Sequence, residues 1–224
     1  AVTVNVLVLG ASRGIGLELV RQQRAAGHRV VATARDDAGL SRLQALGATA
    51  LRLDVSSAAG CAGLAWRIDG EQFDEAWLVA GVYGPRTSAP ETPTQDEFDQ
   101  VMHTNVLAAM RLLPQLAEAL APGARLAVLS SIMGSIGQRS NGGGWLYRAS
   151  KAALNSVLKD MSFVLAGRAT CVALHPGWVQ TDMGGTGAAL AVERSAADLR
   201  ATVAALTPAD NGRFLNHDGQ PLPW

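Results

Sequence analysis

Cysteine is scarce in this chain of 224 residues, and its scarcity narrows the class of protein. The two cysteines, Cys61 and Cys171, lie far apart and lack the spacing of metal ligands. Small secreted domains held together by disulfides carry a denser and more regular cysteine framework. We therefore expect a reducing, cytoplasmic setting, with neither a disulfide framework nor a metal site.

The sequence also lacks a net charge and a long apolar run. Nineteen basic side chains balance nineteen acidic ones, so no sustained field would draw the chain to nucleic acid or to an anionic membrane. The apolar stretch from Val2 to Leu9 is too short to span a membrane, has no basic region before it, and runs straight into a glycine loop. We expect no nucleic-acid partner and no membrane partner, so any recognition of phosphate must be local.

Neither a repeat nor a low-complexity linker divides the chain. With 48% hydrophobic residues, it is long enough to bury one substantial core and too short for two ordinary domains. We therefore expect residues 1–224 to form a single domain.

Short runs rich in Val, Ile and Leu alternate with helical patterns. Continuous apolar runs are typical of strands that are buried on both faces, and six are expected at 4–9, 30–34, 50–53, 76–79, 126–129 and 169–174. Helices are expected at 15–26, 57–68, 95 to about 120, and 145–165. This alternation predicts an α/β fold with a Rossmann-type, doubly wound parallel sheet.

Local signals refine the long helix and the loops. Thr94 stands three residues before Glu97, which predicts a capping box, and Pro114 predicts a kink further along the same helix. The glycine-rich or weakly patterned segments 134–144 and 183–192 are expected to be loops on the substrate side.

A glycine loop follows the first strand and leads directly into the first helix. It reads Gly10-Ala-Ser12-Arg13-Gly14-Ile15-Gly16. Glycines allow a tight turn and let the backbone approach a pyrophosphate, while the amides and dipole of the helix start favour an anion. The alternative is a loop whose glycines only relieve steric strain. The strand, loop and helix context favours a dinucleotide site.

Arginines stand where the adenosine ribose of a dinucleotide should lie. Arg35 follows the second strand, where an acidic residue would suit a free 2′-hydroxyl and an arginine suits a 2′-phosphate. Arg13 adds a second guanidinium to the same phosphate. NADP(H) is therefore favoured over NAD(H), which would require both arginines to face solvent. Asp54, beside Val55 at the end of the third strand, is expected either to bind the adenine amino group or to stabilise a turn.

Tyr147 and Lys151 are spaced one helical turn apart, so that both side chains can share a site. A tyrosine with its usual pKa of about 10 is a poor base at neutral pH, and a nearby ammonium is expected to lower that pKa. Ser131, at the end of the fifth expected strand, can hold the same substrate oxygen. The alternative is a packed tyrosine beside a lysine that reaches solvent.

Together these residues resemble the short-chain dehydrogenase/reductase family over essentially the whole chain, and most closely its C-factor and Sniffer-type carbonyl reductases. The resemblance is carried by Ser130-Ser131-Ile-Met-Gly-Ser-Ile, Tyr147-Arg-Ala-Ser-Lys151-Ala-Ala-Leu-Asn155, His175-Pro-Gly-Trp-Val-Gln-Thr-Asp-Met-Gly-Gly185 and the closing Pro223-Trp224.

The resemblance implies a role for each matching residue. It implies that Tyr147 donates the proton, that Lys151 holds the nicotinamide ribose and lowers the tyrosine pKa, and that Ser131 orients the carbonyl. Asn105 would help to keep a water near the lysine. The backbone of Ala80 and Gly81 would contact the cofactor, and the nicotinamide would be lined by Pro176, Gly177, Val179 and Thr181. The family also implies a homodimer or homotetramer, formed through the long helix and the Tyr147 helix.

The chain departs from the family pattern in two places. Leu78-Val79-Ala80-Gly81 replaces the usual Asn-Asn-Ala-Gly, so two polar side chains become apolar and their polar support is expected to be lost. The interval from Ser131 to Tyr147 is longer than in most members, which leaves Ser135 as the alternative to Ser131.

The leading functional prediction is an NADP(H)-dependent carbonyl reductase or alcohol dehydrogenase acting on a small, fairly apolar molecule. The pocket is expected to be walled by Met133, Trp145, Trp178 and Met183, although large apolar residues are also common in cores. The alternative is a signalling or regulatory protein of the C-factor type that binds the dinucleotide with little turnover.

Overall fold

A computed structural model describes residues 3–181, 183–184 and 187–224 of the chain. Val2 of the first apolar stretch, Asp182 and Gly185 of the quoted motif, and Thr186 of the expected second loop lie outside the described residues.

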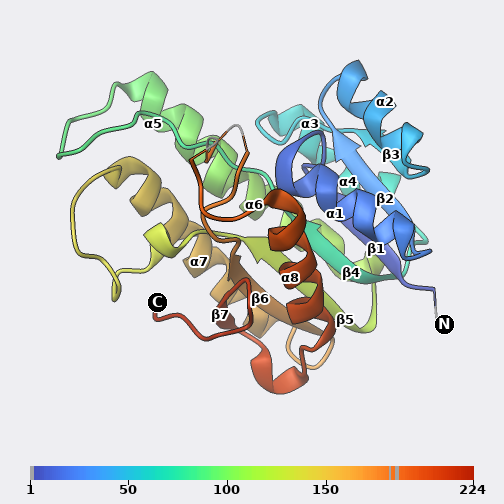
Figure 1. Cartoon of the computed structure of the whole chain (residues 1–224). Helices are drawn as coiled ribbons and strands as arrows, with labels where there is room; N and C mark the ends of the chain where they lie inside the picture. The colour runs from blue at the N-terminus through green and yellow to red at the C-terminus, as the bar shows by residue number, and fades with distance from the viewer. Residues whose placement is uncertain (1–2, 182, 185–186) are drawn as a thin grey trace.

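A seven-stranded parallel sheet forms the centre of the described structure, in the order β3-β2-β1-β4-β5-β6-β7 (Figure 1). The strands are β1 (Asn5–Leu9), β2 (Arg29–Ala34), β3 (Thr49–Arg52), β4 (Phe73–Leu78), β5 (Leu120–Leu129), β6 (Ala169–His175) and β7 (Arg213–Asn216). Four strands are buried along nearly their whole length, as the continuous apolar runs predict: β1, β2, β4 and β6. The predicted fold class is confirmed.

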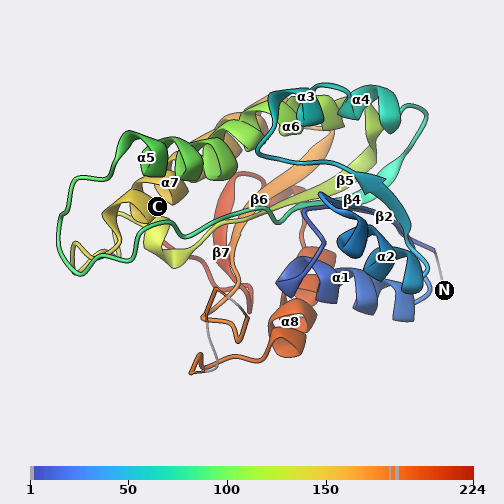
Figure 2. The same cartoon turned by 90° about the horizontal axis from the view of Figure 1, so that it is seen from above.

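Helices cover both faces of the sheet, as Figure 2 shows. One face carries α1 (Gly14–Ala25), α2 (Asp37–Ala45) and α8 (Val192–Ala204). The other carries α3 (Ala58–Ala62), α4 (Leu64–Arg67), α5 (Gln95–Met102), α6 (Ala108–Leu116) and α7 (Trp145–Val164). Each face has its own apolar core, because alternate residues of every strand point to opposite sides.

The long expected helix is interrupted. A π-helical turn, η1 (His103–Leu107), joins α5 to α6, and a short 3₁₀ turn, η2 (Ala117–Ala119), ends the helical stretch before Leu120 begins β5. The irregular turn therefore precedes Pro114, which lies inside α6. The predicted capping box is confirmed: Glu97 N donates to the Thr94 hydroxyl, and Thr94 N donates to the Glu97 carboxylate.

Three elements are absent from the sequence-based prediction, namely α2, α8 and β7, and the helix expected at 57–68 divides at Gly63 into α3 and α4. The missed elements are short or rich in polar and small residues, so hydrophobic periodicity marks them weakly. Two further 3₁₀ turns are η3 (Ile132–Gly134) and η4 (Pro208–Asp210).

The strand order reverses between β1 and β4, which are neighbours in the sheet. In open α/β sheets, ligands bind outside the carboxyl ends of the strands at such a reversal. Most of the expected cofactor residues follow the ends of β1 to β6, while Asn105 lies in η1 and Tyr147 and Lys151 lie in α7. Among the described helices, none is long and apolar enough to cross a membrane.

Candidate active site

A cleft of about 630 Å³ lies at the carboxyl ends of the strands. It is lined by most of the residues expected to bind the dinucleotide: Gly10, Ser12, Arg13, Gly14, Ile15, Gly16, Arg35, Asp54, Val55, Ala80, Gly81, Tyr147, Lys151, Pro176 and Thr181. Gly177 and Val179 are not among the lining residues, and Val179 is buried where it pairs with Leu190. Residues far apart in the sequence are thus brought to one cavity.

The glycine loop leaves no room for a side chain at Gly10 or at Gly16. Gly10 has a φ of +86°, which only glycine adopts readily, and a Cβ there would lie 3.1 Å from Ala80 N. A Cβ on Gly16 would lie 2.4 Å from the Gly10 carbonyl oxygen, inside any real contact distance. The backbone is therefore packed tightly at the point where α1 begins and opens into the cleft. This shape fits the close approach of a pyrophosphate to a helix start.

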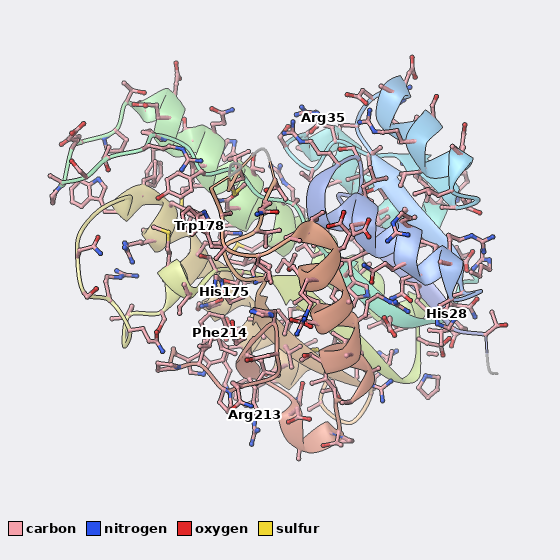
Figure 3. The ribbon with its side chains drawn as sticks, viewed as in Figure 1. His28, Arg35, His175, Trp178, Arg213 and Phe214 are labelled. Carbon is pink, nitrogen blue, oxygen red and sulfur yellow. The ribbon has the colours of Figure 1, made fainter. Side chains whose placement is uncertain are left out.

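The far end of the cleft carries positive charge. Arg35 is exposed at the carboxyl end of β2, while His28 lies near the other end of that strand (Figure 3). Arg35 and Arg13 both line the cleft. Asp54 accepts hydrogen bonds from the amide and hydroxyl of Ser56, and these bonds lower the pKa of its carboxyl group. The turn role that the sequence allowed for Asp54 is therefore present.

Three of the expected catalytic residues meet at the other end. Tyr147 and Lys151 are both buried on α7, and the Lys151 Nζ atom lies 5.6 Å from the centre of the Tyr147 ring. The Ser131 side chain lies close enough to the Tyr147 hydroxyl to act on it and lower its pKa. The alternative, Ser135, is fully buried, and its hydroxyl donates to the Pro223 carbonyl oxygen. The geometry therefore favours Ser131.

The expected lowering of the tyrosine pKa is not found. Burial raises the pKa of Tyr147 to about 12, and the influence of Ser131, which lowers this pKa, is smaller than the effect of burial. Burial also lowers the pKa of Lys151 to about 8, because the charged ammonium loses water. Desolvation, which the helical spacing did not reveal, is the largest influence on the pKa of both groups. Tyr147 consequently keeps its proton at neutral pH.

Asn105 is buried in the π-helical turn η1 and holds the backbone of the segment that follows β4. Its Oδ1 atom accepts from Val82 N at 2.8 Å, and its Nδ2 atom donates to the Val82 carbonyl oxygen at 2.8 Å and to the Ser150 hydroxyl at 3.0 Å. The polar side chains expected at positions 78 and 79 are absent, and Asn105 holds the backbone further along the segment, at Val82.

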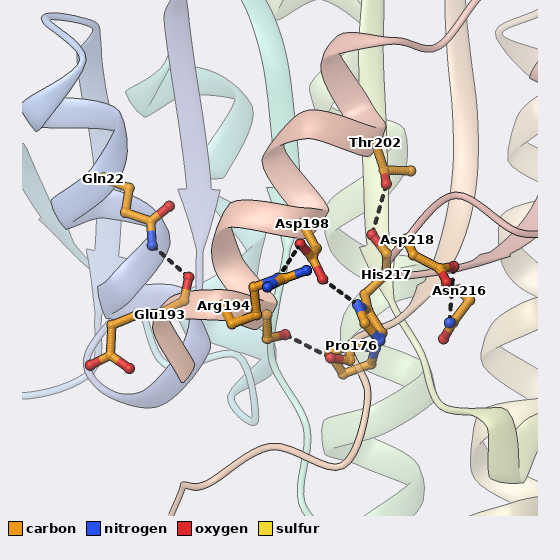
Figure 4. A network of polar contacts seen from close by, with 10 residues as sticks. Gln22, Pro176, Glu193, Arg194, Asp198, Thr202, Asn216, His217 and Asp218 are labelled. Atoms are coloured by element: carbon orange, nitrogen blue, oxygen red, sulfur yellow. Dashed lines mark hydrogen bonds and ion pairs between the residues drawn. The ribbon is translucent and has the colours of Figure 1, made fainter. Parts of the chain in front are cut away.

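A polar network lies behind Pro176 and connects α8 with the segment after β7 (Figure 4). The Ser195 hydroxyl donates to the Pro176 carbonyl oxygen at 2.6 Å, and His217 Nδ1 lies 2.8 Å from an Asp198 carboxylate oxygen. A Cβ on Gly177, whose φ is +87°, would lie 3.2 Å from the His217 ring. The Ser195 hydroxyl and the His217 ring therefore support the Pro176-Gly177 turn.

The four residues expected to wall the substrate pocket occupy different positions. Met183 lines the cleft and is 41% exposed, whereas Met133 is half-buried near the Tyr83 hydroxyl. Trp145 and Trp178, which are 42% and 61% exposed, are not among the residues that line the cleft, and each indole N–H donates to a backbone carbonyl oxygen. Figure 3 labels Trp178 on the segment that follows β6.

Sequence reasoning missed Tyr83 and Arg86, which follow β4. The ring centres of Tyr83 and Tyr147 are 4.4 Å apart, and the Arg86 guanidinium carbon lies 4.3 Å from the centre of the Tyr83 ring. Arg86 also donates a 2.7 Å hydrogen bond to the Met183 carbonyl oxygen. The one available signal was their position directly after a strand whose end faces the site.

The fold and the cleft define a class of protein. It is an α/β protein with a parallel sheet and a glycine loop at the point where the strand order reverses. The family model for short chain dehydrogenases matches residues 4–205. The chain belongs to the short-chain dehydrogenase family.

Individual relatives agree with this assignment. The chain is 40% identical over 123 residues to the C-signal of Myxococcus xanthus, an alignment that covers 54% of this chain and 74% of the relative. Among solved structures, the carbonyl reductase Sniffer of D. melanogaster is 31% identical, with a TM-score of 0.86 and full coverage of both chains. A carbonyl reductase from Pseudomonas aeruginosa PAO1 in complex with NADP is 35% identical, with a TM-score of 0.88 and full coverage of both chains.

Proposed function

We propose that this chain is an NADP(H)-dependent carbonyl reductase, or an alcohol dehydrogenase in the reverse direction. The observation that carries the proposal is that Tyr147 and Lys151 line the same cleft as the glycine loop and Arg35, with Ser131 acting on Tyr147. The names of similar solved structures, which include carbonyl reductases and an NADP complex, support it.

The residues of the cleft fit a dinucleotide. The tight glycine backbone at the start of α1 would receive the pyrophosphate, Arg13 and Arg35 would bind the 2′-phosphate, and Lys151 would hold the nicotinamide ribose. When bound, a reduced nicotinamide supplies a hydride to the substrate carbon. Pro176 and Thr181 line the same cleft and would contact the nicotinamide.

The protein's own residues would manage the proton and the oxygen. Ser131 donates a hydrogen bond to the carbonyl oxygen, where negative charge develops. Tyr147 then transfers its phenolic proton to that oxygen, and its raised pKa ensures that the proton is present at neutral pH. Asn105 acts indirectly, because it positions the backbone at Val82 and the hydroxyl of Ser150, which in turn donates to the Tyr147 carbonyl oxygen.

A fluorescence titration with NADPH and with NADH tests the cofactor, followed by turnover of a panel of reactive carbonyl compounds. We expect tighter binding of NADPH, a selective loss of NADPH affinity in Arg35→Ala, and a loss of turnover with intact binding in Tyr147→Phe. Equal binding of both dinucleotides would contradict the NADP(H) preference. NADPH binding without turnover of any carbonyl compound would favour a regulatory role, which the similarity to C-signal makes the second candidate.

We further propose a small-molecule substrate and a homodimer or homotetramer built through the helical stretch from α5 to α6 and through α7. Sedimentation velocity measures the second point directly, and a monomer at micromolar concentration would contradict it.

A further inference from the structure

Tyr83 and Arg86 place a cation beside the proposed proton donor. Tyr83 packs against Tyr147 with the ring planes tilted by 51°, and the guanidinium of Arg86 lies over the ring of Tyr83. The charge of Arg86 is felt at the reacting hydroxyl, since it acts to lower the pKa of Tyr147. An anionic group on a substrate bound at Tyr147 would therefore lie in a favourable field.

Two glycines at positive φ lie beside Tyr83, one next to it in the sequence and one across from it in space. Gly84 has a φ of +77°, and a Cβ there would lie 2.4 Å from a methyl carbon of Val101. Gly144 has a φ of +65°, and a Cβ there would lie 2.6 Å from the Tyr83 hydroxyl oxygen. Gly144 therefore leaves room for the Tyr83 hydroxyl, and Gly84 lets the backbone next to Tyr83 pass close to Val101.

Arg86 links the segment that follows β4 to the segment that follows β6. One of its terminal nitrogens donates to the Met183 carbonyl oxygen, and Met183 lines the cleft from the segment after β6. Stacking uses the face of a guanidinium, whereas a carboxylate binds its edge, where the N–H groups diverge as a fork. The two interactions are compatible in one arginine.

We propose that Arg86 determines substrate specificity by selecting carbonyl compounds that carry a carboxylate at a distance from the reacting carbonyl group. The carbonyl oxygen meets Tyr147 and Ser131, the body of the molecule lies against Tyr83, and the carboxylate binds the guanidinium edge. This inference rests on the proposed carbonyl reduction and refines the sequence-based expectation of a fairly apolar substrate.

The test compares 4-carboxybenzaldehyde with its methyl ester, using kcat/KM for NADPH-dependent reduction. The two compounds share the reacting aldehyde and differ in the charge at the far end. We expect the wild type to prefer the acid by about 10-fold or more, as a charged hydrogen bond would give. Arg86→Gln should abolish this preference, chiefly through KM, and Arg86→Lys should keep part of it.

Arg139→Gln is the matched control, because Arg139 is another exposed arginine nearby that bonds a backbone carbonyl oxygen, that of Met133. It should leave the ratio of acid to ester unchanged. Removing the bond to Met183 can slow both reactions in Arg86→Gln, but only recognition of the carboxylate changes their ratio.

The outcomes separate the two proposals. A wild type that reduces the ester as well as the acid overturns the specificity role and leaves carbonyl reduction in place. Equal losses for both compounds in Arg86→Gln overturn it as well, since Arg86 would then only tie two loops together. A wild type that reduces neither compound, nor any of the carbonyl panel, overturns the proposed function and this inference with it.

Discussion

Replacing Lys151 with methionine should stabilise the free protein, although it removes a residue of the proposed catalytic set. Lys151 is 4% exposed, and its burial lowers the pKa from the ordinary 10.5 to about 8. The unfolded chain therefore holds its proton more tightly than the folded one. Between those two pH values the unfolded state binds more protons, so the wild type gains stability as the pH rises.

The size of the effect follows from the same two pKa values. A shift of one pKa unit corresponds to about 1.4 kcal/mol, so the buried charge costs about 3 kcal/mol at pH 7, about 2 kcal/mol at pH 9 and less than about 1 kcal/mol at pH 10. Methionine has a similar length and no charge. Lys151→Met should remove this cost, with an advantage over the wild type that fades towards pH 10.

The measurement is chemical denaturation of the cofactor-free protein, followed by tryptophan fluorescence at pH 7, 8, 9 and 10 and at one protein concentration. The only other lysine in the sequence, Lys159, is exposed and provides the control variant Lys159→Met. Its effect should stay within about 1 kcal/mol and be independent of pH. A Lys151→Met protein that is no more stable at pH 7, or whose advantage persists at pH 10, would refute the assignment of the cost to a buried charge.

Three further predictions concern the cofactor loop, the proton donor and the support of the Pro-Gly turn. Gly16→Ala should weaken NADPH binding by about 10-fold or more in a fluorescence titration, because its Cβ would lie 2.4 Å from the Gly10 carbonyl oxygen. The control Gly63→Ala should leave binding unchanged, because a Cβ there would meet nothing within 4 Å. Because the pKa of Tyr147 is about 12, the phenol stays protonated from pH 7 to 10. The rate of single-turnover carbonyl reduction should therefore change little across that range. The rate of alcohol oxidation should rise with pH, because that direction needs the phenolate. A reduction rate that falls steeply near pH 8 would contradict this. Asp198→Ala should lower the free energy of unfolding by about 1–3 kcal/mol and raise the Kd for NADPH, because His217, which packs against the Pro-Gly turn, loses its partner. An unchanged Kd would show that the turn does not need this support.

The features that sequence reasoning predicted well depend on short stretches of chain. The glycine loop lies between a buried strand and a helix, and Tyr147 and Lys151 are one turn apart on α7, so local periodicity was enough to bring each set together. The capping box of α5 is likewise local. Six strands were expected because apolar runs mark strands that are buried on both faces.

The features that it missed depend on contacts between distant segments. Tyr83 reaches Tyr147 only because Gly144 leaves space for its hydroxyl, and no pattern in either segment indicates that encounter. The pKa of Tyr147 went in the opposite direction to the expectation, since burial depends on the packing of the whole site. The short edge strand β7 carries too few residues to show a period.

The departure at Leu78 and Val79 can now be explained by the packing on the two faces of the sheet. Leu78 packs in the core on one face of the sheet, and Val79 packs against the core on the other, so the two apolar residues extend the buried strand. Asn105 supplies the hydrogen bonds to the backbone at Val82 from a different element. Gly81 remains necessary, because a Cβ there would lie 3.1 Å from the Lys151 nitrogen. The glycine backbone and the position of the lysine are therefore coupled, while the two residues before Ala80 are free to serve the core.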